Sequence, residues 1–164
     1  MDLKLLDTFQ PTVLIVEPSR HFASLLRHIL SVGGVRDVEY AADAYGALEV
    51  IKGAHVDMAI VDSELAGITA LELTNVIRRA SDSPNQALPI ILLSDRPTRR
   101  LIDNALLAGI DCYVRKPVSA DTLLQRIKWC LEKGVAPEDA LSAEHATVLG
   151  DEFMLDDGVD TLAI

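Results

Sequence analysis

The chain has 164 residues, 49% of them hydrophobic, so we expect a single domain with an ordinary buried core. The formal net charge of −10 is uneven: residues 1–133 carry all 15 Lys and Arg, whereas residues 134–164 carry eight acids and none of these bases. No run approaches the roughly 18 to 20 apolar residues that span a bilayer, and the acidic segment repels nucleic acid and membrane surfaces, which excludes both as expected partners.

Five short apolar runs alternate with segments of helical periodicity. The runs cover residues 12–16, 38–41, 58–62, 88–93 and 112–115. Apolar residues recur at helical spacing over residues 22–30, 47–51, 70–77, 101–106 and 123–131. Ser19, Asp43 and Ser119 are placed to cap helix starts, and Gly53 and Gly109 stand where helices should stop.

The alternation of strands and helices predicts an α/β domain with a parallel sheet covered on both faces. The first, third and fourth runs are continuously apolar, which is typical of central strands. The second and fifth runs are shorter and are interrupted by Glu39 and Arg115, which edge strands tolerate. We therefore expect a flavodoxin-like (βα)5 doubly wound sheet with the strand order 2-1-3-4-5.

Ligands of such a sheet bind beyond the carboxyl ends of its strands, so we expect the chemistry just after four of the runs. The residues there are Glu17, Pro18 and Ser19; Asp62, Ser63 and Glu64; Ser94, Asp95 and Arg96; and Lys116 and Pro117. Each of them alone would most often be a turn residue or a solvated side chain. Together they supply a carboxylate nucleophile, a further acid, a hydroxyl and an ammonium, which is the set that phosphoryl transfer needs.

Over residues 11–133 the sequence resembles the response-regulator receiver family. The segment ALLAGIDCYVRKP, residues 105–117, is the most specific part of the resemblance. The resemblance implies that Asp62 accepts the phosphoryl group and that Ser94 and Lys116 are the other catalytic residues. It also implies that Ser94 and Tyr113 act as switch residues.

The same resemblance implies a Mg²⁺ site formed by the side chains of Glu17 and Asp62 and the backbone carbonyl of Glu64. Two positions depart from the family pattern. The second acid of the family's pair is replaced by Pro18, which has no side-chain oxygen, and Asp95 adds bulk and negative charge next to the hydroxyl position. Because Mg²⁺ demands near-octahedral oxygen ligands, we expect this site to be weak.

Two functions remain open. In the first, the chain is a stand-alone response regulator of a two-component system. It accepts phosphate on Asp62 from a histidine kinase or phosphotransfer protein and signals by protein–protein contact. It would be no enzyme beyond its own phosphorylation and dephosphorylation. The alternative is a pseudo-receiver, a protein-binding module that works without phosphorylation. Asp62, Ser94 and Lys116 favour the first; Pro18 and Asp95 favour the second.

The downstream protein target is expected to bind the face made by the helix around residues 101–106, the strand 112–115 and the helix around 123–131. The residues expected to carry this contact are Arg99, Arg100, Tyr113 and Lys128. A switching aromatic at position 113 would bury or expose its ring there. Glu64 and Arg96 are placed to form an ion pair across the mouth of the site.

The expected domain organisation is an N-terminal extension over residues 1–10, a receiver domain over 11–133 and an acidic, mobile tail over 134–164. The tail is too short and too acidic to form a DNA-binding domain. Cys112 and Cys130 have no metal-like spacing, and the N-terminus shows no secretory signal, so we expect a cytoplasmic protein.

Overall fold

The computed structural model describes residues 9–80 and 85–133. Most of the expected N-terminal extension and all of the expected acidic tail lie outside the described residues. The strands are β1 (Thr12–Val16), β2 (Asp37–Ala41), β3 (Met58–Asp62), β4 (Ile90–Ser94) and β5 (Cys112–Arg115). The helices are α2 (Arg20–Val32), α3 (Ala44–Gly53), α4 (Ala70–Arg79), α5 (Arg99–Ala108) and α6 (Ala120–Lys133).

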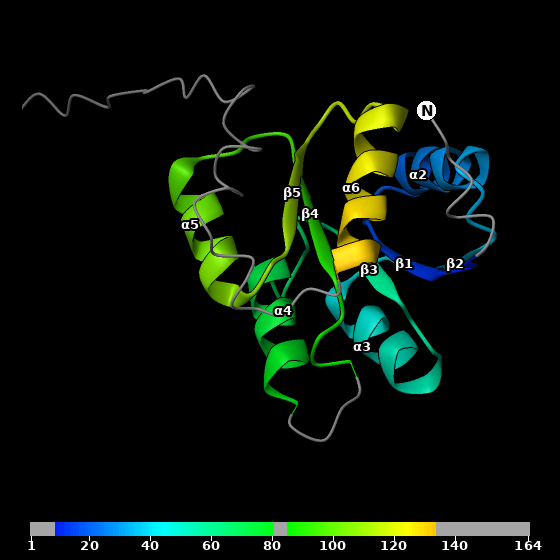
Figure 1. The fold of residues 1–164 in the computed structure, drawn as a ribbon. Coiled ribbons are helices and arrows are strands. Elements are labelled where there is room, and N and C mark those ends of the chain that lie inside the picture. Colours follow the sequence, from blue (N-terminus) through cyan, green and yellow to red (C-terminus); the bar gives the residue numbers. More distant parts are fainter. Residues whose placement is uncertain (1–8, 81–84, 134–164) are drawn as a thin grey trace, which may run out of the picture.

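The five strands form one parallel sheet in the order β2-β1-β3-β4-β5, so the predicted topology is confirmed (Figure 1). Strands β3 and β4 are buried along their whole length, and β2 and β5 form the edges as expected. Strand β4 begins two residues later than predicted. Leu88 donates its backbone N–H to Asn85 in a turn and Pro89 has no N–H to donate, so regular pairing begins after Pro89.

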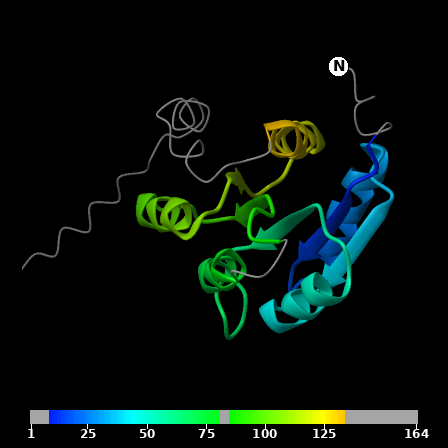
Figure 2. The ribbon, with the colours of Figure 1, turned by 60° about the horizontal axis from the view of Figure 1, so that its bottom comes forward.

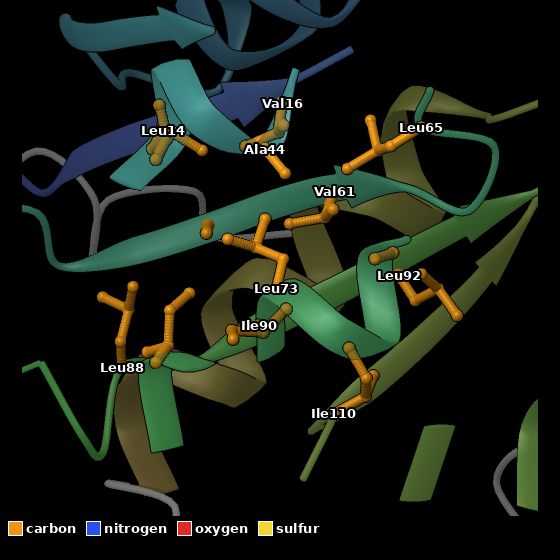
Figure 3. Packing of buried hydrophobic residues seen from close by; sticks show 14 of the residues in the cluster. Leu14, Val16, Ala44, Val61, Leu65, Leu73, Leu88, Ile90, Leu92 and Ile110 are labelled. Carbon is orange, nitrogen blue, oxygen red and sulfur yellow. The ribbon is translucent and has the colours of Figure 1, made fainter. Parts of the chain in front are cut away.

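Helices cover both faces of the sheet, with α2 and α6 on one face and α3, α4 and α5 on the other (Figures 1 and 2). Alternate residues of each central strand point to opposite faces, which divides the core into two clusters. Leu14, Val61 and Leu92 pack against the layer that contains Leu73 of α4 (Figure 3). No helix of the described part of the chain is long and apolar enough to cross a membrane.

The predicted helix boundaries are confirmed by the capping contacts. The Ser19 hydroxyl accepts the Phe22 N–H at 3.2 Å, and the Asp43 carboxylate accepts the Gly46 N–H at 2.8 Å. Gly109 ends α5 with a φ of 93°, in the left-handed region that favours glycine. These caps determine the residue at which each helix begins or ends, and therefore the length of the loop that joins it to the neighbouring strand.

Arg78, in the last turn of α4, ties that helix to the amino ends of β4 and β5. Its guanidinium donates to the Gly109 carbonyl, with Nη2 at 2.8 Å, and to the Asp111 carboxylate at 3.0 Å. The same Asp111 oxygen accepts the Ile90 N–H at 2.7 Å. This group of contacts, called here the Arg78 clamp, lies at the end of the sheet opposite the carboxyl ends of the strands.

Burial raises the pKa of Asp111 to about 6, although the Ile90 N–H and the Arg78 guanidinium both oppose the shift. A carboxyl with a raised pKa in the folded state stabilises the fold at pH values below its unfolded pKa, and this contribution is lost as the pH rises through the folded pKa. We therefore expect the Asp111 contribution to the free energy of unfolding to fall by at most about 3 kcal/mol between pH 4 and 6.

Urea unfolding of wild type and Asp111→Asn across pH 4 to 8 tests this expectation. The asparagine cannot titrate, and the other carboxyl groups cancel in the difference between the two proteins. The stability of wild type relative to the variant should fall as the pH rises through 6 and then level off, about one pH unit higher. A relative stability that rises over pH 4 to 6 would contradict the pKa shift.

Candidate functional site

Two buried carboxylates lie side by side at the carboxyl ends of β1 and β3. Val16 of β1 pairs with Val61 of β3, so the residues that follow them, Glu17 and Asp62, are neighbours across the sheet. Glu17 is 3% exposed and Asp62 is 5% exposed. Burial raises the pKa of Glu17, and repulsion from Asp62 adds to the rise against the opposing hydrogen bond from the Ser19 N–H. Two such carboxylates need a cation close by.

Lys116 supplies that positive charge from the loop after β5. Its Nζ lies 3.3 Å from Oε2 of Glu17 and donates a short hydrogen bond to Oδ2 of Asp62. Burial alone would lower the pKa of Lys116, but hydrogen bonding and attraction from Asp62, with a further contribution from Glu17, raise it. The ammonium also lies 4.2 Å from the centre of the Phe22 ring, in a cation–π contact. Lys116 is therefore held between the two acids as a cation.

Ser94 ends β4, the strand next to β3, and Tyr113 lies on the edge strand β5. Ser94 is buried at the end of β4, and its hydroxyl oxygen accepts the Arg96 N–H at 3.3 Å. The Tyr113 hydroxyl donates to the Ser94 carbonyl at 3.4 Å. Tyr113 is only 8% exposed, and burial raises the pKa of its hydroxyl to about 12. The ring is therefore turned inward here, toward the cluster beneath α3, α4 and α5.

The structure brings together Glu17, Asp62, Ser94 and Lys116 from four strand ends, as the sequence analysis expected of them, and Tyr113 of β5 joins them through its hydrogen bond to the Ser94 carbonyl. The side chains of Glu64 and Arg96 are exposed, and the ion pairs of the described residues do not include the one expected between them. That expectation was wrong because each residue contributes its backbone N–H to the site instead, Glu64 to Asp62 at 2.7 Å and Arg96 to Ser94.

The residues expected to carry the partner contact do not all lie at the surface. Arg99 and Arg100 are exposed at the start of α5, and Arg99 forms an ion pair with Asp103 at 3.8 Å. Lys128 of α6 lies 3.9 Å from Glu132. Tyr113 of β5 is buried, so its ring would have to turn outward before a partner could contact it.

The residues present fit a Mg²⁺ ion poorly. Each of the four carboxylate oxygens of Glu17 and Asp62 already accepts a hydrogen bond, two from backbone N–H groups and two from Lys116. Pro18 is exposed and offers no side-chain oxygen, which leaves the backbone carbonyl of Glu64 as the remaining expected ligand. The described part of the chain contains no cluster of three or more His, Cys, Asp or Glu able to hold a metal ion.

Phe22 and Tyr40 contact the site and were not expected there. The Phe22 spacing indicated only a helix core position, although its place one turn after the Ser19 cap could have indicated closeness to the strand end. The Tyr40 hydroxyl donates to the Glu17 carbonyl at 3.0 Å from the edge strand β2. No sequence pattern shows which way an edge-strand aromatic points along its strand.

The site has the groups to accept a phosphoryl group. Asp62 offers a carboxylate, the kind of group that can act as a nucleophile toward phosphorus, and the Glu64 N–H holds it in place. The Lys116 ammonium and the Ser94 hydroxyl lie where they can bind oxygens of a phosphoryl group attached to Asp62. The start of α2 borders these groups, since its cap residue Ser19 donates its N–H to Glu17.

Comparisons with known proteins agree with this geometry. The family model described as "Response regulator receiver domain" matches residues 13–128. The transcriptional regulatory protein YvrH of Bacillus subtilis is 26% identical over 136 residues, which are 83% of this chain and 55% of YvrH. The response regulator MprA of Mycobacterium tuberculosis is 31% identical over 144 residues, 88% of this chain and 59% of MprA. The chain thus spans little more than half of these two regulators.

Shorter proteins match over nearly their whole length. The chemotaxis protein CheY-3 of Vibrio cholerae is 26% identical over 121 residues, which are 74% of this chain and 92% of CheY-3. The solved structure of CheY4 from Vibrio cholerae matches with a TM-score of 0.68 at 26% identity, over 74% of this chain and 99% of that one. A putative response regulator from Chloroflexus aurantiacus matches with a TM-score of 0.69 at 29% identity, over 75% and 98%.

Proposed function

This chain belongs to the response regulator receiver family, and we propose that it is a two-component regulator that accepts a phosphoryl group on Asp62. The observation that carries the proposal is the buried Asp62 carboxylate at the end of β3, in contact with Lys116 and beside Ser94. Proteins of this family are generally signalling proteins and not enzymes. In our proposal the only reaction this chain catalyses is its own phosphorylation and dephosphorylation.

The proposed reaction is an in-line displacement at phosphorus. An Asp62 oxygen attacks the phosphorus of a phosphohistidine, the N–P bond breaks, and the histidine nitrogen keeps its electron pair. Lys116 moves its hydrogen bond from the Asp62 carboxylate to a phosphoryl oxygen, and the Ser94 hydroxyl donates to another. The product is an acyl phosphate on Asp62, which carries more negative charge than the carboxylate it replaces.

The proposed donors are a histidine kinase or a phosphotransfer protein, and the proposed output is contact with a downstream protein. Receivers generally meet such donors and targets. Because the Tyr113 hydroxyl bonds the Ser94 carbonyl, movement of Ser94 toward a phosphoryl group changes the packing of the Tyr113 ring. We propose that this change is transmitted to the face around Arg99, Arg100 and Lys128. We also propose a cytoplasmic location.

Members of this family generally bind Mg²⁺ at the acidic pocket, whereas the groups in this pocket fit the ion poorly. We propose weak Mg²⁺ affinity as a consequence of Pro18. Pro18→Asp would add an oxygen ligand next to Glu17, and a gain of one ligand is expected to raise Mg²⁺ affinity about tenfold or more, or about 1.4 kcal/mol.

Calorimetric titration with Mg²⁺ measures this affinity directly, without any phosphoryl transfer. Pro18→Ala is the matched control, because it removes the proline ring without adding an oxygen, and it should bind Mg²⁺ as weakly as wild type. Equal Mg²⁺ affinity in wild type and Pro18→Asp would mean that the substitution at this position does not limit the metal site.

Labelling with phosphoramidate in excess Mg²⁺, read by intact mass, tests the proposed function. We expect one phosphoryl group per chain, slow to form and removed by hydroxylamine, which cleaves acyl phosphates. A wild-type chain that gains no phosphoryl group would overturn the proposal and leave the phosphorylation-independent binding module. The three relatives described above do not favour that module, since they are a transcriptional regulatory protein, a response regulator and a chemotaxis protein.

A further inference from the structure

The outer side of α2 is basic and partly apolar. Its exposed residues include Arg20, His21, Arg27 and His28, and the helix contains no acidic residue at all. Leu25 and Val32 are 44% and 63% exposed on the same side. Val32 lies two turns after Leu25, and His28 lies between them, so this histidine and the two apolar residues share one stripe. Arg20 and Arg27, also two turns apart, form a second line of residues on the exposed side of the helix. We call these six residues the α2 basic face.

The two arginine charges of the α2 basic face, Arg20 and Arg27, are not neutralised by other described residues. In the described ranges, none of its Arg or His side chains forms an ion pair, whereas Arg99 of α5 pairs with Asp103 and Lys128 of α6 pairs with Glu132. A patch of one sign with exposed apolar side chains is suited to a partner that is both acidic and apolar.

The chain itself contains such a segment. Residues 151–157 read DEFMLDD, with three apolar residues between two acidic pairs. They belong to the part of the chain that follows α6, and α6 packs against α2, with Leu124 of α6 next to Gly33 at the end of α2 (Figure 1). The 18 residues from position 133 to 151 can span up to roughly 60 Å, so any point on α2 is within reach.

We propose that residues 151–157 dock on the α2 basic face of their own chain, with the acidic pairs next to Arg20 and Arg27 and the apolar centre on Leu25 and Val32. The start of α5 is the other basic region of the described chain, around Arg96–Arg100. It is the weaker candidate, because Asp95 precedes it and Asp103 already pairs with Arg99.

A segment docked there would lie beside the mouth of the phosphoryl site. Ser19, the cap of α2, donates its N–H to Glu17, and Phe22 of the first turn contacts the Lys116 ammonium. The docking itself does not depend on the proposed function.

Amide NMR spectra of the unphosphorylated full-length chain test the docking. We compare wild type with the variant Asp151→Asn/Glu152→Gln/Asp156→Asn/Asp157→Asn, in which both acidic pairs are neutral. The expected result is a set of chemical-shift changes over residues 20–32. The matched control neutralises Glu138, Asp139 and Glu144 and should leave those amides unchanged. Raising the salt to 1 M, where the Debye length is about 3 Å, should reproduce the effect of the neutral variant in part.

Reversal of charge on the helix provides the second arm. Arg20→Glu/Arg27→Glu should change the amide shifts of residues 151–157, because it removes the positive charges on which the acidic pairs dock. Arg99→Glu/Arg100→Glu should leave the shifts of residues 151–157 unchanged. Shift changes confined to residues 96–100 would move the docking to α5, and changes that depend on protein concentration would assign it to a second copy; either overturns the proposal. Unchanged α2 amides would also overturn it, whether or not Asp62 can be labelled.

Discussion

Asp62→Asn is expected to abolish the hydroxylamine-sensitive label completely, while the rest of the domain stays folded. The asparagine has nearly the shape of the aspartate and keeps an oxygen for the Glu64 N–H, but its amide is not a nucleophile toward phosphorus. Lys116 retains its contact with Glu17, so the ammonium is not left alone in the buried site. Intact-mass measurement after phosphoramidate treatment, with circular dichroism to verify the fold, gives the result.

Asp95→Asn is the matched control, because Asp95 is an exposed carboxylate next to the site hydroxyl. It should keep the label, and the label should form faster, since a negative charge near the incoming phosphate has been removed. A label of unchanged amount on Asp62→Asn would show that another residue is the acceptor. In that case the contact of Lys116 with Asp62 would be structural.

Arg78→Met is expected to lower the free energy of unfolding by about 3 to 5 kcal/mol, the usual cost of removing one partner of a buried ion pair. The methionine fills the volume of the arginine stem but leaves Asp111 without a cation, and it removes the donors to the carbonyl groups of Gly109 and Gln86. Such a loss is a large part of the stability of an ordinary domain. Urea unfolding at pH 8 gives the value.

The neighbouring Arg79 offers a control on the same helix. Arg79 is exposed, and Arg79→Met should change stability by no more than about 0.5 kcal/mol. Because Asp111 can take up a proton, the loss in Arg78→Met should be smaller at pH 5 than at pH 8. Arg78→Met/Asp111→Asn should lose less than the sum of the two single variants. An additive double variant would mean that Arg78 stabilises the fold only through the Gly109 and Gln86 carbonyls.

The architecture could be derived from local patterns. Continuous apolar runs identified β1, β3 and β4 as central, and the polar interruptions at Glu39 and Arg115 identified the edges. The central strands could be identified because a parallel strand covered on both faces is apolar at nearly every position, which gives a run of consecutive apolar residues in the sequence. The cluster of Glu17, Asp62, Ser94 and Lys116 followed from the same logic, since parallel strands bring their carboxyl ends to one edge.

The start of β4 and the expected ion pair of Glu64 with Arg96 show where local patterns were insufficient. A run of apolar letters does not show that Pro89 delays pairing while Leu88 is used in a turn. Closeness in sequence to the site does not show that Glu64 and Arg96 contribute backbone N–H groups and leave their side chains in water.

The sequence by itself determined the strand order and the helix caps, because each depends on patterns of residues a few positions apart. It also determined the group of side chains that share the site, because parallel strands bring their carboxyl ends to one edge of the sheet. Only the tertiary structure decided that Phe22 lies against the Lys116 ammonium and that Arg78 joins α4 to β4 and β5. These contacts join residues far apart in the chain, and they depend on which way a long side chain turns. They follow from the mutual packing of helices and sheet, and no periodicity in the chain encodes that.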